Sequence, residues 1–316
     1  MQRGRVSQQR EPNFTHSMTL SKRIFFFLLT NVAVIAVASV MLSLFNVAPY
    51  LSGTGLNYQS LLVFAAIFGF SGSIVSLLIS KWMAKHAFGI RIIDTPTNDH
   101  ERFVRDTIEH LARKASIGMP EVGIYDSPEA NAFATGASKH NALVAVSTGL
   151  LHEMSRDEVE GVLGHEISHI ANGDMVTMAL IQGVVNTFVI FFARIAAYGV
   201  QMFLSRDDEG EGIGMLAYHL TAIVFEILFG ILASIIVMAF SRQREFRADR
   251  GSAQLLGREK MIAALTRLQS LKETLVDPRG KAFNAMKISD KPSPILALFS
   301  SHPPLALRIE ALKRSA

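Results

Sequence analysis

The chain has 316 residues, 49% of them hydrophobic, and a mean hydropathy of +0.29. This composition is too apolar for an ordinary soluble domain and indicates an integral membrane protein. The chain contains no cysteine, which excludes disulfides and thiolate metal ligands, and its net charge of +4 is not gathered into a basic stripe with interleaved aromatic residues. No nucleic-acid partner is therefore expected.

The N-terminal part of the chain changes from polar to strongly apolar. Residues 1–20 are predicted to be a disordered extension, and Met18 is an alternative start of translation. Residues 21–85 then form a two-helix transmembrane region, because the uncharged stretches 24–45 and 61–80 are each long enough to cross a hydrocarbon core about 30 Å thick. The first stretch is too long for the apolar part of a cleaved signal peptide.

Residues 86–174 are interpreted as the first part of a catalytic domain. Charged residues interleaved with apolar ones at helical spacing predict an amphipathic helix over residues 99–116. Two short β-prone runs, 122–125 and 142–147, predict a small sheet.

The last helix of this segment carries an H-E-x-x-H motif. A capping box formed by Ser155 and Glu158 begins the helix, and an Asn-Gly pair ends it. His165 and His169 are four residues apart on the same helical face, so both imidazoles can bind one metal ion, while Glu166 can reach a water molecule beside it. The alternative is a surface helix with solvated histidines, but the well-bounded helix favours a zinc site.

Residues 175–240 hold two further apolar runs, 175–204 and 220–240. Arg194 interrupts the first and Glu226 the second, and such groups inside a bilayer usually face protein or water. The pair of runs is either a transmembrane hairpin, across which the two charges could pair, or a hairpin buried in protein. Because the histidines precede the first run and the next candidate ligand follows the second, both runs cross the membrane or neither does.

Basic residues border the apolar runs on one side. Lys22 precedes the first run, and Lys81 and Lys85 follow the second, whereas the loop 46–60 is uncharged and the loop 205–219 is acidic. The positive-inside rule therefore predicts a cytoplasmic catalytic domain.

Residues 241–316 complete the predicted catalytic domain. Glu245 and Asp249 lie four residues apart, so the first could be the third metal ligand and the second could fix the tautomer of a ligand histidine. Taken alone, their arginine-rich surroundings are more typical of a solvated salt-bridge surface. Two further helices are predicted over residues 260–275 and 305–313, joined by a turn-rich connection.

Taken together, the motifs H-E-I-S-H and E-F-R-A-D resemble those of the HtpX group of membrane-bound zinc endopeptidases, relatives of the CAAX prenyl proteases. An N-A-F-A-T segment that begins at Asn131 and a late H-P-P motif resemble two further features of that group. The resemblance implies one zinc ion per chain, Glu166 as the catalytic base, and the metal ligands His165, His169 and Glu245.

The same resemblance implies two further roles. Asn131, Ala132 and Phe133 would belong to an edge strand to which an extended substrate adds through main-chain hydrogen bonds. His302, held by two prolines, is either a residue of a rigid turn or a donor to the oxyanion of the reaction.

The sequence thus predicts a mainly α integral membrane protein with transmembrane helices and a zincin-like α+β catalytic domain that carries a small β-sheet. The resemblance implies a zinc metalloendopeptidase of the bacterial inner membrane. It would degrade misfolded or damaged membrane proteins at the cytoplasmic face, in protein quality control and the stress response. Its partners would be protein substrates and the lipid bilayer. The alternatives are a CAAX-type processing protease, which has more membrane spans, and a non-catalytic scaffold with a vestigial zinc site.

Overall fold

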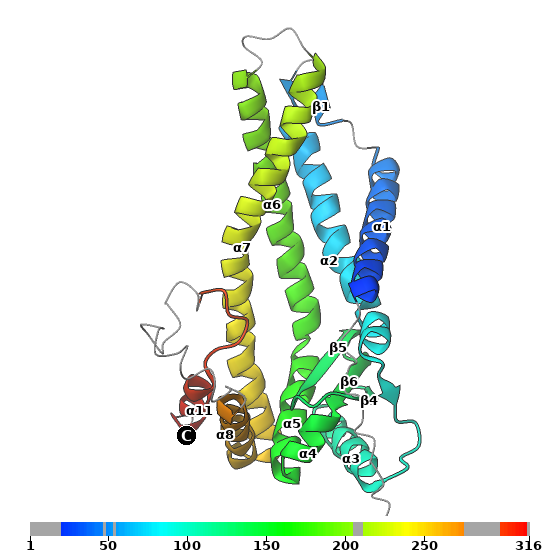
Figure 1. Cartoon of the computed structure of the whole chain (residues 1–316), viewed down its shortest axis with the longest axis vertical. Coiled ribbons are helices and arrows are strands. Elements are labelled where there is room, and N and C mark those ends of the chain that lie inside the picture. Colours follow the sequence, from blue (N-terminus) through cyan, green and yellow to red (C-terminus); the bar gives the residue numbers. More distant parts are fainter. Residues whose placement is uncertain (1–19, 47–48, 53–54, 205–210, 275–297, 315–316) are drawn as a thin grey trace, which may run out of the picture.

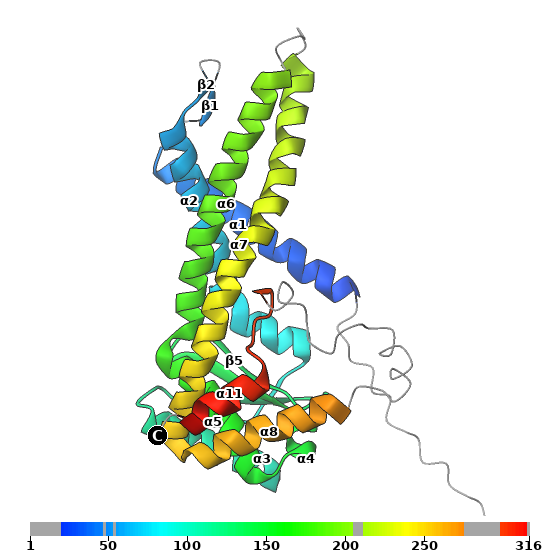
Figure 2. The ribbon, with the colours of Figure 1, turned by 90° about the vertical axis from the view of Figure 1, so that its left-hand side faces the viewer.

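Four long helices stand in a row above a smaller α/β region (Figures 1 and 2). The computed structural model describes residues 20–46, 49–52, 55–204, 211–274 and 298–314, so the predicted N-terminal extension and the connection before the last helix lie largely outside the described residues. Within the row, α2 packs against α1 and α6, and α6 packs against α7. The bounds are α1 Leu20–Leu44, α2 Tyr58–Phe88, α6 Asp174–Leu204 and α7 Glu211–Leu256.

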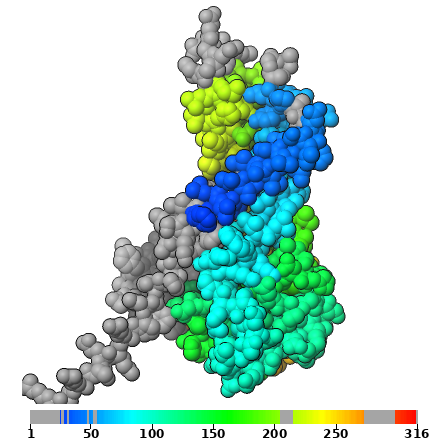
Figure 3. All heavy atoms as spheres, turned by 90° about the vertical axis from the view of Figure 1, so that its right-hand side faces the viewer, coloured from blue at the N-terminus to red at the C-terminus, as the bar shows by residue number. Residues whose placement is uncertain are grey.

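Among the described residues, three of these helices are long and apolar enough to cross a bilayer: α2, α6 and α7. The apolar part of α1 that the structure describes is shorter, so a fourth span stays a prediction. In Figure 3, α1 lies on the outer flank of α2, above the α/β region. Only 11% of the most apolar window of α6 and 6% of that of α7 is buried inside the protein. The described part of this chain therefore does not bury the two helices, and their exposed apolar surfaces favour a lipid environment.

The α2–α6 contact is close because small residues meet there. A Cβ atom added at Gly69 of α2 would lie 2.6 Å from Oγ1 of Thr187 in α6, so only glycine allows this approach. Between the next pair of helices, α6 and α7, Nη2 of Arg194 lies 3.0 Å from Oε1 of Glu226. The two charges that interrupt the apolar runs thus pair with each other.

Several boundaries differ from the sequence-based ones. Residues 211–219, expected as a loop, are helical, because the apolar spacing of α7 continues through them. The same helix runs without interruption past residue 240, the expected end of the membrane part, because the charged residues that follow are good helix formers. One helix of 46 residues therefore carries both an apolar run and a candidate metal ligand.

The α/β region contains a four-stranded sheet in the order β3-β4-β6-β5, in which β4 and β6 are parallel and the other neighbours antiparallel. The strands are β3 Arg91–Ile92, β4 Glu121–Tyr125, β5 Ala132–Ser138 and β6 Asn141–Ser147. A short hairpin, β1 Leu51–Ser52 and β2 Gly55–Leu56, lies at the opposite end of the molecule (Figure 2). The helices of the region are α3 Asp99–Lys114, α4 Thr148–Glu153, α5 Arg156–Asn172, α8 Arg258–Thr274 and α11 Leu305–Arg314.

Helix α5 is the centre of this region. Its apolar residues, among them Leu163 and Ile167, join the core formed with α3 and the sheet. Its other side packs against α7 and α8. A Cβ atom at Gly164 would lie 2.6 Å from Oγ of Ser252, so a glycine at this position lets α5 and α7 approach closely. The predicted capping box of Ser155 is present, and α5 ends at Gly173 in the left-handed conformation.

Candidate metal centre

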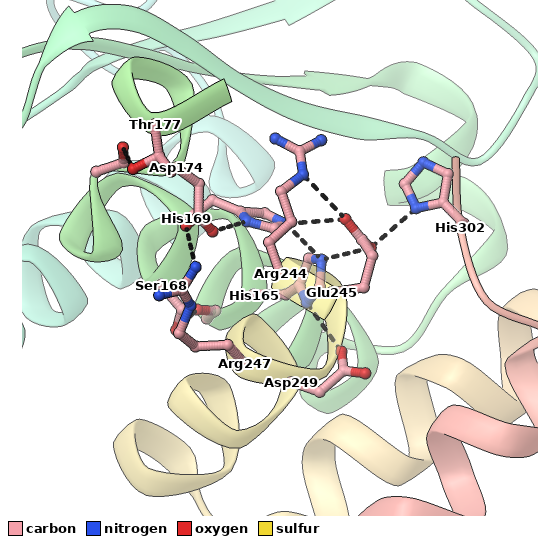
Figure 4. Close-up of polar contacts among 12 residues, drawn as sticks. His165, Ser168, His169, Asp174, Thr177, Arg244, Glu245, Arg247, Asp249 and His302 are labelled. Atoms are coloured by element: carbon pink, nitrogen blue, oxygen red, sulfur yellow. Dashed lines mark hydrogen bonds and ion pairs between the residues drawn. The ribbon is translucent and has the colours of Figure 1, made fainter. Parts of the chain in front are cut away.

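Helices α5 and α7 bring three buried side chains together (Figure 4). The Nε2 atoms of His165 and His169 lie 3.0 Å apart. His165 Nε2 is 3.4 Å from Oε2 of Glu245, and His169 Nε2 is 3.4 Å from Oε1. The exposed fractions of the three residues are 7%, 8% and 1%. The i, i+4 spacing on α5 supplies the imidazoles, and the close approach of α7 supplies the carboxylate.

These three donor atoms fit a divalent metal ion. Ligand atoms about 2.0–2.2 Å from a tetrahedral centre lie about 3.3–3.6 Å from one another, close to the separations in this cluster. Both carboxylate oxygens of Glu245 are buried and accept no hydrogen bond from any described residue, although cationic groups lie at ion-pair distance. Two imidazoles and one carboxylate are also a donor set typical of catalytic zinc sites.

A second carboxylate orients the first histidine. Nδ1 of His165 lies 2.9 Å from Oδ1 of Asp249, which is 1% exposed. Arg308 of α11 holds that carboxylate in a fork, since its Nε donates to Oδ2 at 2.8 Å and its Nη2 to Oδ1 at 2.6 Å. The contact to Nδ1 directs Nε2 of His165 toward the metal position.

The second histidine has its own carboxylate. Nδ1 of His169 lies 2.7 Å from Oδ2 of Asp174, the first residue of α6, and Arg247 donates to the other oxygen at 3.2 Å. Sequence reasoning missed both Asp174 and Arg308. Asp174 could have been found, because it is an acidic residue at the start of an apolar helix, just after His169. No local sequence signal pointed to Arg308.

The electrostatics of the candidate metal centre favour a cation. Burial disfavours the charged form of His165, but Asp249 and Glu245 outweigh it and raise the pKa of this imidazole to about 9. Burial also opposes the charged form of His169, and Asp174 and Glu245 again raise its pKa. The carboxylates thus create a site that holds positive charge, and a metal ion that binds must displace protons.

A cavity of about 130 Å³ borders the ligands. Glu166, half-buried, lines this cavity together with Asn131 and Ala132 at the edge of the sheet. Phe133 is not among its lining residues in the described chain; its ring packs 5.3 Å from that of Phe88 and 5.8 Å from that of Tyr125. Consecutive strand residues point to opposite faces, which explains the separation of Ala132 from Phe133.

His302 also lines this cavity, and its side chain is 59% exposed. Its Nδ1 lies 2.9 Å from Oε2 of Glu245. The structure therefore places this histidine directly beside the candidate ligand carboxylate, with the rest of the ring at the cavity.

Comparison with known proteins agrees with this geometry. Residues 98–316 match the family described as Peptidase family M48. The "Protease HtpX homolog" of Methylacidiphilum infernorum is 52% identical over 93% of this chain and 98% of its own length. The "Protease HtpX" of Thioalkalivibrio sulfidiphilus is 55% identical over 92% of this chain and 98% of its own length.

Among solved structures, S. mikatae Ste24p has a similar fold, with a TM-score of 0.60 at 19% sequence identity over 93% of this chain. This chain spans only 64% of that protein. The family match and the near full-length relatives confirm the resemblance drawn from the sequence motifs, and the fold agrees with it. The chain therefore belongs to peptidase family M48, and it is a membrane metalloendopeptidase.

Proposed function

We propose that this metalloendopeptidase cleaves misfolded or damaged membrane proteins at the cytoplasmic face of the bacterial inner membrane, with zinc as its metal. The position of the candidate ligands beside the apolar helices carries the proposal. His169 lies in the last turn of α5, and α6 begins after a single turn residue, Gly173. Glu245 lies on α7 itself, just after the apolar run that ends at Phe240. A peptide that leaves the bilayer therefore meets the metal centre within a few helical turns.

The distribution of charge supports a cytoplasmic active site. Lys81 and Lys85 lie at the α/β end of α2, where both form ion pairs with Glu121 of β4. Arg242 and Arg247 lie at the corresponding end of α7. The opposite ends of the helices have fewer basic residues, and the positive-inside rule assigns the basic side to the cytoplasm.

In the proposed mechanism, His165, His169 and Glu245 hold the zinc ion, which when bound supplies a Lewis acid for the scissile carbonyl and lowers the pKa of a water molecule. Glu166 follows the first ligand on α5 and lines the cavity. Its carboxylate accepts the proton of the attacking water and later delivers it to the leaving amine, as a general base and then a general acid.

Other residues would position the substrate. Strand β5 is the edge strand of the sheet, and Asn131 and Ala132 line the cavity at its beginning, so an extended substrate can add to this edge by main-chain hydrogen bonds. Because Nδ1 of His302 faces Glu245, only Nε2 of that ring is left for the substrate. With a hydrogen on Nε2, the ring can donate to the oxyanion.

The test uses full-length protein purified in detergent, with an unfolded membrane protein and an unfolded soluble protein as substrates. We expect cleavage that stops on chelation and returns with added zinc. Glu166→Gln should retain zinc while the rate falls about 100-fold or more. Asp157→Asn, an equivalent change at an exposed position of the same helix, is the control. Chelator-resistant cleavage, or an active Glu166→Gln variant, would contradict the mechanism.

The location is tested separately in cells. A cysteine introduced within residues 205–210, between the two membrane helices of the hairpin, should react with a membrane-impermeant reagent from the outer side. A cysteine at the exposed Asp157 should react only after the membrane is opened. The reverse pattern would overturn the cytoplasmic assignment but not the chemistry.

A further inference from the structure

A second recess lies between α6 and α7, on the other side of the candidate ligands from the cavity that His302 lines. It has a volume of about 30 Å³. Asp174, which contacts His169, and Arg244, which lies next to Glu245 in sequence, both line it. Figure 4 shows Asp174 and His302 at opposite ends of the ligand cluster. We call this recess the α6–α7 groove; it is lined by Asp174, Thr177, Met178 and Ile181 of α6 and by Phe240, Gln243, Arg244 and Arg247 of α7.

The sequence spacing shows that the groove follows the helices. On each helix its residues stand at positions i, i+3, i+4 and i+7, which is one helical face. The helices are antiparallel, so the Asp174–Arg247 ion pair marks one end and Ile181 with Phe240 marks the other. Seven residues of helix rise about 10 Å. The groove therefore changes from charged beside the metal centre to apolar toward the bilayer.

Arg244 occupies the middle of this groove and is only weakly engaged. Its Nε is buried and has no hydrogen-bond partner among the described residues. The ion pair that it forms within that part of the chain, with Oε1 of Glu245, is long at 3.8 Å. In Figure 4 its guanidinium extends past the ligands toward the strand above them. This group can therefore donate to a molecule that lies between the metal centre and the edge of the sheet.

We propose that the α6–α7 groove is a substrate subsite for the residue on the membrane side of the scissile bond. Met178, Ile181 and Phe240 contact the end of an apolar side chain there, and Arg244 donates to a main-chain carbonyl oxygen of the substrate. This assignment rests on the proposed function and makes it more specific: cleavage takes place next to an apolar residue as the chain leaves the bilayer. A lysine or arginine at that position is rejected by Arg244.

The charges of the groove favour a peptide over an anionic lipid headgroup. The buried carboxylate of Asp174 lines the same recess, and Arg247 is already paired with it at 3.2 Å. Glu245 lies beside Arg244. A phosphate would meet the carboxylate of Asp174 within the recess and that of Glu245 next to Arg244, whereas a neutral carbonyl would meet a donor at little electrostatic cost.

The first experiment maps cleavage sites by mass spectrometry on one unfolded protein digested by the full-length, zinc-loaded enzyme. Wild type should show apolar residues at one fixed position next to the scissile bond. Ile181→Ala and Phe240→Ala should each lower cleavage at such sites about tenfold relative to sites with small residues. Leu180→Ala, next to Ile181 but 50% exposed and not a groove residue, is the matched control and should keep the wild-type profile.

The second experiment tests Arg244 with a quenched fluorescent peptide that wild type cleaves. Arg244→Gln should raise KM about tenfold with unchanged zinc content, and Arg244→Lys should recover part of that loss, because lysine retains a donor and the charge. Arg250→Gln, an exposed arginine on the same helix, is the control. Repeating the assay in lipid nanodiscs with and without anionic phospholipid examines the lipid alternative.

The outcomes separate the two proposals. If zinc-loaded wild type cleaves no substrate, the proposed function fails. If wild type cleaves but Ile181→Ala and Phe240→Ala retain its profile, the subsite is wrong and the function stands. If Arg244→Gln removes only a dependence on anionic phospholipid, the groove binds headgroups and the inference is overturned.

Discussion

Nδ1 of His169 lies 2.7 Å from Oδ2 of Asp174, a contact that joins the helix of the two candidate ligand histidines to the first residue of a membrane helix. Asp174 is 1% exposed, and its other oxygen accepts from Arg247 of α7. The orientation of one candidate ligand therefore depends on the mutual position of α6 and α7. A movement of these helices in the bilayer would therefore change the orientation of His169 through a single hydrogen bond.

This relationship predicts the effect of Asp174→Asn. An amide keeps the size of the side chain but removes the charge that fixes the imidazole, and such losses typically weaken metal binding 10–100-fold. Competition with a chromophoric zinc chelator, using detergent-purified protein, measures the change. Arg247→Gln should have a smaller effect, because its guanidinium contacts only the outer oxygen of Asp174. An unchanged zinc affinity in Asp174→Asn would show that the contact does not orient a ligand.

Local sequence signals were sufficient to predict much of the candidate metal centre. The capping box at Ser155 and the Asn-Gly pair predicted the two ends of α5 correctly, because both signals act within one helical turn. The i, i+4 spacing of His165 and His169 needs no tertiary information either. Glu245 was different: its local charge pattern favoured a solvated surface, and only the family resemblance pointed to a role as a ligand. The structure places its carboxylate beside the two histidines, where it could bind a metal ion.

The remaining features depend on contacts between distant segments. Arg308 reaches Asp249 across 59 residues of sequence, and no spacing rule connects a late helix to an earlier carboxylate. The direction of Phe133 follows from the pleat register of β5, which the residues 131–133 alone do not reveal. The uninterrupted course of α7 was missed because the change from apolar to charged residues was interpreted as a domain boundary rather than as one helix leaving the bilayer.

Arg308 should stabilise the metal-free protein more than the zinc-loaded one. It is 6% exposed, forms the fork with Asp249, and places Nη1 3.3 Å from Oε2 of Glu245. Arg308→Met leaves both buried carboxylates without this cation, a loss of about 3 kcal/mol or more for a buried pair. Zinc would replace part of the missing charge at Glu245.

Thermal unfolding of Arg308→Met with chelator and with zinc measures this difference. The melting temperature should fall in both conditions and fall further with chelator. Arg314→Gln, at the exposed end of the same helix, should match wild type in both. An equal fall in melting temperature with and without zinc would mean that Arg308 acts only through packing.

Glu101 predicts a pH dependence of stability away from the metal centre. It is 1% exposed and accepts hydrogen bonds from the amide of Thr97 at 2.7 Å and from Arg91 at 2.7 Å. The amide of Thr97, followed by Arg91, lowers the pKa of this carboxyl from 4.5 to about 2. A depressed folded-state pKa means that its stabilisation is complete above about pH 5 and is lost as the pH falls from 4.5 toward 2.

The comparison of wild type with Glu101→Gln checks this prediction. In the presence of chelator, so that metal loss does not contribute, the difference in melting temperature should be largest near neutral pH and should shrink below pH 4.5. Glu109→Gln, at a half-exposed glutamate of the same helix, is the control for the substitution itself. A difference that stays constant down to pH 3 would mean that the charge of Glu101 contributes nothing.

The ion pair between Arg194 and Glu226 predicts a pattern across three variants. Their side chains are 18% and 32% exposed within the apolar helix pair, where lipid rather than water surrounds the protein. Glu226→Leu leaves an arginine without its partner at a depth where a lone charge costs about 3 kcal/mol on insertion scales. Arg194→Leu should destabilise the protein in a similar way, because it leaves Glu226 without its partner.

The double variant removes both charges and should recover most of the lost stability, because an apolar pair of similar size often replaces a buried ion pair without loss. Melting temperature in detergent and the amount of protein inserted into membranes measure all three, and Ile231→Leu on the lipid-facing side of α7 is the control. If the double variant is as unstable as the sum of the single ones, Arg194 and Glu226 do not stabilise each other, and each is held by other groups.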